Sequence, residues 1–219
     1  MIPVKVLALR YLANASPSLC AALGAPEGSP SLGILTTDCD DATYIALDAA
    51  TKAAEVEVAY GRSFYAGAGN ASTPYAGEVI GIIAGQTPGA VRSGMEAALS
   101  ELTRVGFQEV NGIPFLAHTV SSVGTFLAKE AGVAPGTAIA YLIAPPLEGM
   151  YAMDFALKAA DVKLCKLYAP PSETNFGGGL LSGTQSACDA ACAAFGDAVA
   201  EVAGMPKAFP FGEGGSPKG

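Results

Sequence analysis

Two stretches of the chain, residues 46–58 and 152–164, share one pattern of apolar and polar positions. In each, an Ala-rich segment is followed by a short run in which polar and apolar residues alternate. Alanine is the strongest helix former, and Asp48 lies four residues before Lys52, the favourable order for a helical ion pair. Alternation with a period of two is typical of a half-buried strand. Each stretch therefore predicts a helix that runs into a strand, and Lys158 is the counterpart of Lys52, 106 positions later.

The segments before these stretches repeat as well. Residues 4–12 form an apolar run that is typical of a strand. Ser16 and Pro17 then offer a helix N-cap and a proline at the first helical position, and Gly24 offers a C-terminal stop. The same order returns over residues 115–132. Second strands are predicted at residues 31–36 and 137–143.

The remainder of each half predicts a loop, a strand and a longer helix. The loops, residues 63–76 and 169–179, are rich in residues that favour turns. They lead into predicted strands at residues 78–84 and 180–182. The helix that follows each strand has one apolar face, formed by Val91, Met95, Ala98 and Leu102 in the first half and by Cys188, Cys192, Phe195 and Val199 in the second.

This order of elements predicts an α+β fold in two tandem domains, each a small, mainly antiparallel sheet with packed helices. The chain has 219 residues, of which 51% are hydrophobic and 15% charged, so each half has enough apolar residues for its own core. We place the first domain at residues 1–104 and the second at 105–205. Residues 206–219, rich in glycine and proline, predict a disordered tail.

Composition narrows the classes of function. The net charge of −8 argues against a protein that binds the phosphate backbone of nucleic acid. No apolar run reaches the roughly 18–20 residues of a membrane span, and the first residues have no secretory pattern, so we expect a cytoplasmic protein. The mean hydropathy of +0.38 is high for a protein without membrane spans, and indicates apolar surface buried between subunits.

The reactive residues favour no enzyme, metal site or cofactor. Only one histidine, His118, is present, and the five cysteines form no C-x-x-C pair. Glycine-rich segments match neither a Walker loop nor a dinucleotide-binding motif. The acidic run at residues 38–41 departs from an EF-hand loop, because Thr43 stands at the required glycine and Ala49 at the required glutamate. Asp40 and Asp41 are more simply interpreted as helix caps.

The doubled A-x-D-x-x-x-K-A-A-x-V pattern around Lys52 and Lys158 resembles the domain of bacterial microcompartment shell proteins. Residues 31–44, 60–67 and 144–147, together with the run Pro-Ser-Glu-Thr-Asn at residues 171–175, are similar to the tandem-domain subunits of ethanolamine-utilisation shells. The resemblance covers nearly the whole chain. It implies two circularly permuted shell domains, and a homotrimer that forms a pseudohexameric tile beside other shell proteins in a flat lattice.

In such tiles the motif lysine lies at the edge, so the resemblance implies a lattice contact for Lys52 and Lys158. Spacing alone favours the simpler explanation, in which each lysine is half of a solvated ion pair worth about 0.3–0.5 kcal/mol; it is the doubled motif that favours the lattice role.

The resemblance also implies that the two long loops of each chain meet at the three-fold axis and open or close a central pore for metabolites or cofactors. Glycine makes the backbone rearrangement of such a gate easy, although static surface loops have the same composition. The expected gating residues are Tyr65, Gly67, Gly69 and Asn70 in the first loop, and Glu173, Thr174, Asn175, Phe176, Gly177, Gly178 and Gly179 in the second.

A smaller site is implied within each chain, where Asp40, Glu78 and Phe107 fall at the positions that line a narrow opening in the family. Two carboxylates and an aromatic face suit a small ammonium cation such as ethanolamine. The alternative to a shell subunit is a soluble small-molecule sensor, in which the two α+β domains bind a metabolite at their interface.

Overall fold

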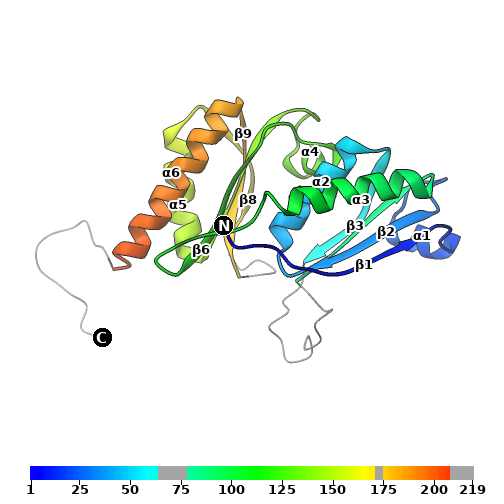
Figure 1. Ribbon diagram of the computed structural model, residues 1–219. Coiled ribbons are helices and arrows are strands. Elements are labelled where there is room, and N and C mark those ends of the chain that lie inside the picture. Colours follow the sequence, from blue (N-terminus) through cyan, green and yellow to red (C-terminus); the bar gives the residue numbers. More distant parts are fainter. Residues whose placement is uncertain (64–77, 171–174, 208–219) are drawn as a thin grey trace, which may run out of the picture.

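The computed structural model describes residues 1–63, 78–170 and 175–207. Its strands form two sheets, and every strand pair in them is antiparallel. Helices cover the sheets, so the fold is α+β as the sequence predicts (Figure 1). None of the described helices is long and apolar enough to cross a membrane.

The two halves contain the same series of elements. The first half consists of β1 (Val6–Leu12), α1 (Pro17–Leu23), β2 (Ser31–Thr37), α2 (Asp40–Ala53), β3 (Val56–Ser63), β4 (Val79–Gly85) and α3 (Pro88–Leu102). The second half begins with the short strand β5 (Gln108–Val110) and continues with β6 (Ile113–Val120), α4 (Thr125–Ala131), β7 (Ala138–Ala144), α5 (Pro146–Ala159), β8 (Val162–Tyr168), β9 (Gly177–Gly183) and α6 (Gln185–Gly204). The proposed boundary at residues 104/105 lies between α3 and β5.

The strand order shows the repeat directly. The first sheet runs β1-β2-β4-β3, and the second runs β5-β6-β7-β9-β8, which is the same order with one strand added at the edge. The last pair of each sheet has an irregularity in register at an equivalent place, between Val58 and Tyr60 in β3 and between Leu164 and Lys166 in β8. The two halves are therefore copies of one unit down to local backbone detail.

Helix boundaries follow from the local sequence. Ser16 is the N-cap of α1, and the helix ends at Gly24, which takes the left-handed conformation with φ 74°. Thr87 caps α3 through its side chain, which accepts the N–H of Ala90. The prediction that Asp40 and Asp41 cap α2 was wrong in detail, because Cys39 is the N-cap and the two aspartates occupy the first helical turn.

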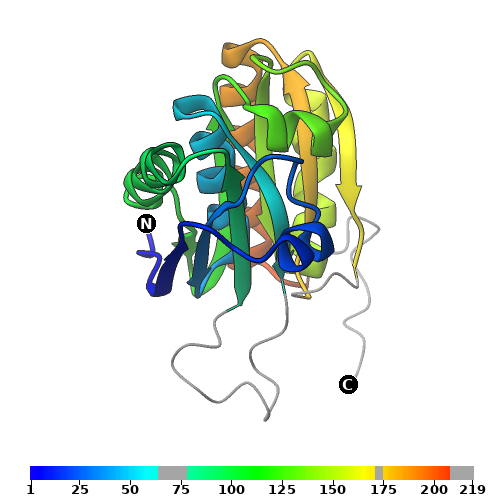
Figure 2. The ribbon, with the colours of Figure 1, turned by 90° about the vertical axis from the view of Figure 1, so that its right-hand side faces the viewer.

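The cores are unequal in extent. The largest cluster of buried side chains joins both halves, since it contains Leu35 and Ile45 from the first half and Leu127, Ile139 and Leu180 from the second. Helix α2 therefore packs against the second half as well as against its own sheet. Figure 2 views the molecule from the α1 end, with the first half in front of the second.

Candidate functional site

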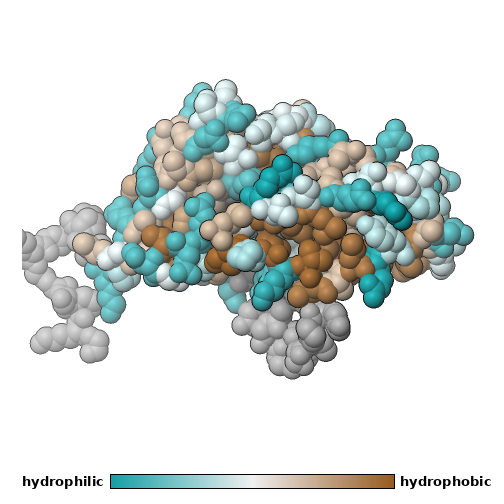
Figure 3. Space-filling view, in the orientation of Figure 1, coloured by the Kyte–Doolittle hydropathy of each residue, from teal (hydrophilic) through white to brown (hydrophobic). Residues whose placement is uncertain are grey.

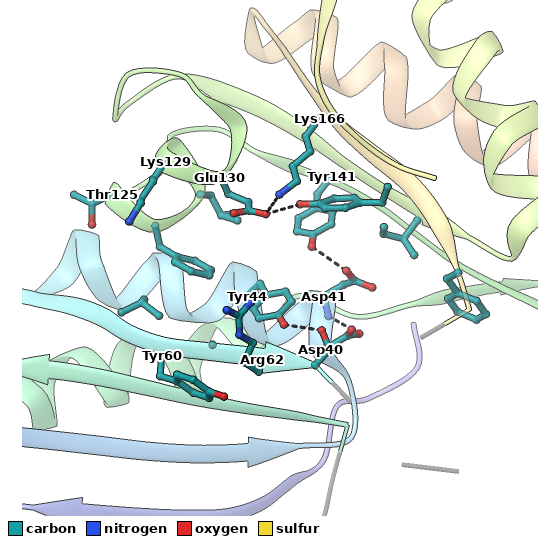
Figure 4. A pocket seen from close by; sticks show the side chains of 18 of the residues that line it. Asp40, Asp41, Tyr44, Tyr60, Arg62, Thr125, Lys129, Glu130, Tyr141 and Lys166 are labelled. Atoms are coloured by element: carbon teal, nitrogen blue, oxygen red, sulfur yellow. Dashed lines mark hydrogen bonds and ion pairs between the residues drawn. The ribbon is translucent and has the colours of Figure 1, made fainter. Parts of the chain in front are cut away.

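A cleft of about 1080 Å³ lies where the two halves meet. The first half contributes the start of α2 and the strand β3, and the second contributes α4, β7, β8 and Phe176 (Figure 4). Its wall combines carboxylates, tyrosine rings and cationic side chains. The labelled side chains that lie around it are Asp40, Asp41, Tyr44, Tyr60, Arg62, Thr125, Lys129, Glu130, Tyr141 and Lys166.

Two adjacent carboxylates form the acidic end of the cleft. Asp40 Oδ1 accepts the backbone N–H of Asp41 at 2.8 Å, and the Tyr141 hydroxyl donates to Asp41 Oδ1 at 2.8 Å. Both side chains are buried, at 7% and 6% exposed. Burial raises the pKa of Asp40, although hydrogen bonds from the Asp41 backbone and the Ser63 side chain oppose the change. Burial and then the Asp40 charge raise the pKa of Asp41.

Glu78 lies close enough to this pair to interact with it electrostatically. Its pKa is raised by burial, and then by the charges of Asp40 and Asp38. Its backbone N–H donates to the Thr37 carbonyl at 2.8 Å, which holds the residue beside the end of β2. A fourth carboxylate, Asp38, accepts the backbone N–H of Lys5 at 2.8 Å. Nevertheless, the described residues contain no group of three or more His, Cys, Asp or Glu placed to hold a metal ion.

Phe107 is placed against Phe176, with 5.7 Å between the ring centroids. Both rings are partly buried against the main core. Of the predicted trio, Asp40 lines the cleft, whereas Glu78 and Phe107 are not among the described residues of its wall. The structure thus places Asp40 and Glu78 within electrostatic range and connects Phe107 to the cleft through Phe176.

The opposite wall contains a connected set of side chains that sequence reasoning missed. Tyr141 and Tyr168 stack with ring centroids 6.3 Å apart, and the Tyr168 hydroxyl donates to Glu130 at 3.4 Å. Lys166 forms an ion pair with the same Glu130 carboxylate and lies 5.2 Å from the Tyr168 ring centroid. Burial raises the pKa of both tyrosines. The sequence feature that could have indicated this set of side chains is Tyr141, the one residue with a hydroxyl group in the otherwise apolar, buried strand β7.

The halves are joined beside the cleft by a buried carboxylate. Asp48 in α2 accepts the backbone N–H groups of Gly124 at 2.7 Å and Leu127 at 2.9 Å, at the start of α4. Lys52 lies 3.6 Å from the same carboxylate and donates to the Ser122 carbonyl at 2.8 Å. A glycine is needed at position 124, because a Cβ there would lie only 2.7 Å from the Asp48 carbonyl oxygen.

The two motif lysines are placed differently. The Lys52 side chain is 36% exposed and is committed to the contact between the halves. The Lys158 side chain is 74% exposed and pairs at 2.6 Å with Asp154, which is itself 58% exposed. Their role at a lattice edge stays a prediction.

The predicted gating residues fall into two groups. Tyr65, Gly67, Gly69, Asn70, Glu173 and Thr174 lie outside the described residues. Asn175 takes a left-handed conformation with φ 64°, and Phe176 packs on Phe107.

The prediction that Gly177, Gly178 and Gly179 belong to a pliable loop was wrong. They are the first residues of β9 and pair with β7. A Cβ at Gly178 would collide with the Leu142 carbonyl oxygen, and one at Gly179 with the Lys166 carbonyl oxygen. These glycines therefore allow the strands to approach closely.

His118 and the two cysteines of α6 lie within the packed part of the second half. His118 lies in β6, where burial lowers its pKa. Cys188 is buried in the core of the second half, and Cys192 is partly buried beside Thr119. What the cleft offers chemically is a pair of buried carboxylates with a third nearby, which can hold a proton or a small cation.

Comparison with known proteins gives consistent results. The BMC domain model matches residues 31–114, from β2 to the start of β6. The chain is 55% identical over 213 residues to the bacterial microcompartment shell protein EutL of Clostridium perfringens, covering 95% of this chain and 98% of that protein. The crystal structure of ethanolamine utilization protein EutL from Leptotrichia buccalis superposes with a TM-score of 0.91 at 54% identity, covering 95% and 98% of the two chains. The trimeric shell protein PduB shares the fold, with a TM-score of 0.75 at 20% identity over 89% of this chain and 87% of that one.

Proposed function

This chain belongs to the bacterial microcompartment shell proteins of the EutL type, and from this premise we propose that three copies close into a flat ring of six similar domains that tiles a shell facet. The family consists of structural shell proteins, so the chain is not an enzyme. The observation that carries the ring is the doubled unit, in which both sheets have the same strand order. A chain with two such units, joined by a contact that can be repeated between chains, needs three copies to complete a six-membered ring.

Two measurements test the ring. Sedimentation at micromolar concentration should give the mass of a trimer, and electron microscopy of the overexpressed protein should show sheets or hexagonal arrays. A stable monomer would contradict the ring.

The cleft between the halves favours a second candidate, a soluble sensor of small molecules. Discrete particles that change on addition of a ligand, and never form sheets, would support the sensor instead.

We further propose that the acidic end of the cleft binds a small ammonium compound such as ethanolamine. The support is the proximity of Asp40 and Glu78: burial raises the pKa of both carboxyls, and the negative charges of Asp40 and Asp38 raise that of Glu78 further. A cation between them would relieve this repulsion. The rings of Phe107 and Phe176 supply a partly buried aromatic surface nearby, which also favours an ammonium group.

Calorimetric titration with ethanolamine, and with ethylene glycol as a neutral analogue, tests this site. Binding should be confined to the amine and should weaken in Asp40→Asn and Glu78→Gln. Affinity should fall as the pH is lowered through the raised carboxyl pKa values, because protonation removes the negative charges that hold the cation. Equal affinity for both compounds, or unchanged binding in both variants, would reject the site while leaving the ring intact.

A gated central pore is the third part of the proposal, with Tyr65, Gly67, Gly69 and Asn70 from one loop and residues 173–176 from the other. Its support is position, since Glu78 follows the first loop and Phe176 is the last residue of the second segment, and both belong to, or adjoin, the proposed amine site. Occupancy of the site could then shift the population of open and closed states. Crystal structures with and without ethanolamine should differ in these segments. Identical segments in both would show that they are static rims.

A further inference from the structure

We propose that the N-terminal segment, residues 1–5, positions the proposed amine site, which consists of Asp40, Glu78 and Phe107. The backbone of this segment holds Asp38 as a further carboxylate of the site, and it holds Phe107 as the aromatic wall. The inference rests on the proposed binding of a small ammonium compound. It adds one carboxylate to that site and identifies the part of the chain that supports it.

The segment lies between the two halves of the chain. It starts near the middle of the molecule, beside the stretch that passes from α3 to β5 (Figure 1). Ile2 donates its backbone N–H to the Phe107 carbonyl at 2.6 Å, and Val4 packs, partly buried, against the core cluster that spans the halves. Strand β1 begins shortly afterwards, at Val6. The segment thus connects the linker between the halves to the first sheet.

Two hydrogen bonds to a single residue of the segment hold Asp38. Lys5 donates its backbone N–H to Asp38 Oδ1 at 2.8 Å, and the Lys5 carbonyl accepts the backbone N–H of Asp38 at 3.2 Å. The first bond fixes the carboxylate and the second fixes its backbone. A hydrogen bond to an ionised carboxylate is roughly twice as strong as one between neutral groups. The position of this charge therefore depends on the N-terminal backbone.

The contact at the linker is close and requires a glycine. Gly106 is buried, and a Cβ there would lie 2.5 Å from the Ile2 carbonyl oxygen and 3.3 Å from Cγ of Met1. Its φ is outside the left-handed region, so the need for glycine comes from this contact rather than from the backbone angles. Any side chain at this position would push the segment away from the linker.

Asp38 acts on the amine site through Glu78. Glu78 donates its backbone N–H to the carbonyl of Thr37, the residue directly before Asp38, at 2.8 Å. Burial, and then the charges of Asp40 and Asp38, raise the pKa of Glu78. A cation bound beside Glu78 is attracted by each of these carboxylates. The hold on Asp38 thus strengthens the site for a positively charged ligand.

The other titratable groups near Glu78 do not offset this attraction. Asp41, at the start of α2, adds a further carboxyl group that interacts with Glu78. Burial raises the pKa of the Cys39 thiol, so this group stays uncharged. Lys5 acts through its backbone, since its side chain is exposed and forms no ion pair within the described part of the chain. The charges that shift the pKa of Glu78 are all negative.

Phe107 is the second group that the segment positions. The bond from Ile2 fixes its backbone, and its ring packs against Phe176 with 5.7 Å between the centroids. An ammonium group is attracted to an aromatic face only within about 6 Å of the ring centroid. A displaced linker would therefore weaken the aromatic contact, just as a displaced Asp38 would weaken the electrostatic one.

Calorimetric titration with ethanolamine tests the hold on Asp38. Lys5→Pro removes the donated N–H, because proline has none, whereas Lys5→Ala removes only the exposed side chain. Both variants lose the lysine charge, so they form a matched pair. Lys5→Pro should weaken binding about fivefold or more, and Lys5→Ala less than about twofold. Sedimentation and thermal unfolding should show that both variants are folded and assembled like the parent.

The pH dependence of binding separates a hold on the charge from a general loosening. In the parent, affinity should fall as the pH is lowered through the raised pKa of Glu78. Asp38→Asn removes a charge that raises this pKa, so the fall should move to lower pH. Lys5→Pro should move it in the same direction, and Lys5→Ala should not.

Two outcomes would contradict the proposal in different ways. If Lys5→Pro matched Lys5→Ala in both affinity and pH dependence, the hold on Asp38 would be overturned and the amine site would stand. A parent that does not bind ethanolamine would contradict both the site and its support.

Gly106→Ala gives an independent test from the linker, with Gly89→Ala as the control. A Cβ at Gly89 would have only Thr87 Oγ1 near it, at 4.0 Å. Mass spectrometry should show faster hydrogen exchange in the N-terminal peptide of Gly106→Ala, and its affinity for ethanolamine should fall about threefold or more. Gly89→Ala should show neither change. Faster exchange with unchanged affinity would overturn the proposal, and so would unchanged exchange, because the segment would then not rest on Gly106.

Discussion

At the level of single residues, the acidic end of the cleft combines charge with burial. Asp40 and Asp41 are adjacent, both buried, and supported by donors that include the Tyr141 hydroxyl. Such a pair disfavours two full negative charges, so the folded chain holds a proton there more tightly than the unfolded chain does. The site is thus tuned for a cation or a proton.

Asp41→Asn should make stability less dependent on pH. Burial raises the pKa of Asp41 above its ordinary 3.8, so the free energy of unfolding falls as the pH rises from that value through the raised pKa. Asparagine cannot ionise, yet its amide oxygen still accepts the Tyr141 hydroxyl. We expect the variant to equal or exceed the parent in stability at about pH 8, with a flatter profile down to about pH 4, by urea denaturation at fixed protein concentration. Asp189→Asn, at an exposed position, is the control, and a variant as pH-dependent as the parent would contradict the assignment.

Gly178→Ala should destabilise the fold rather than change the state of a pore. The residue has φ 154°, and an added Cβ would meet the backbone of Leu142 in the neighbouring strand. Overpacking of this kind typically costs about 1–3 kcal/mol. Thermal unfolding should show the loss, whereas Gly204→Ala, at the end of α6 with open space around it, should be neutral. Equal stability of the two variants would show that β9 can move away from β7.

At the level of elements, α2 connects the halves. It packs on its own sheet, on α4 and on the second sheet, and it supplies both Asp41 and Asp48. A helix with a polar end at the cleft and a buried carboxylate further along can fix the relative position of two sheets. The contact of α2 with the second half therefore holds the two halves in a fixed relative position.

Asp48→Ala should weaken that junction. It removes two hydrogen bonds to a fully buried carboxylate and leaves the N–H groups of Gly124 and Leu127 without this acceptor. The expected loss is about 2–4 kcal/mol in urea denaturation. Asp48→Asn keeps one acceptor oxygen and should lose less, and Asp197→Ala, at an exposed position of α6, should lose little. If Asp48→Ala were as stable as the parent, apolar packing alone would hold the halves together.

At the level of the whole molecule, the described surface includes exposed apolar side chains near the N-terminus. Met1, Ile2 and Val6 are 67%, 42% and 42% exposed, and Figure 3 shows apolar surface gathered over the N-terminal segment and the start of β1. This agrees with the high mean hydropathy of the chain. A protein that works within a shell can leave such surface exposed in the single chain, because assembly covers it.

The double variant Lys52→Ala/Lys158→Ala should leave the trimer intact and reduce its assembly into two-dimensional protein layers. The Lys158 ammonium is mostly exposed, so its loss affects contacts outside the chain, whereas Lys52→Ala also removes a hydrogen bond to Ser122 worth about 0.5–1.5 kcal/mol. Sheets are counted by electron microscopy, and sedimentation reports the trimer. If the double variant assembled into layers as well as the parent does, both lysines would be explained as members of ordinary ion pairs without a role in the lattice.

The sequence by itself determined the repeat, the helix starts at Ser16 and Thr87, the apolar face of α3, and the α+β class. These features depend on residues within a few positions of one another, where capping, periodicity and proline or glycine at fixed places act. The doubled lysine motif also identified the family.

Only the tertiary structure decided which residues meet across the halves. Asp41 and Tyr141 are 100 positions apart, and Asp48 and Gly124 are 76 apart, so no local pattern joins them. Gly177, Gly178 and Gly179 resemble a loop in composition, yet they form a strand because the backbones of β7 and β8 leave no room for side chains there. Local propensity sets what each segment can form, while the partners that pack around a segment decide which form it takes.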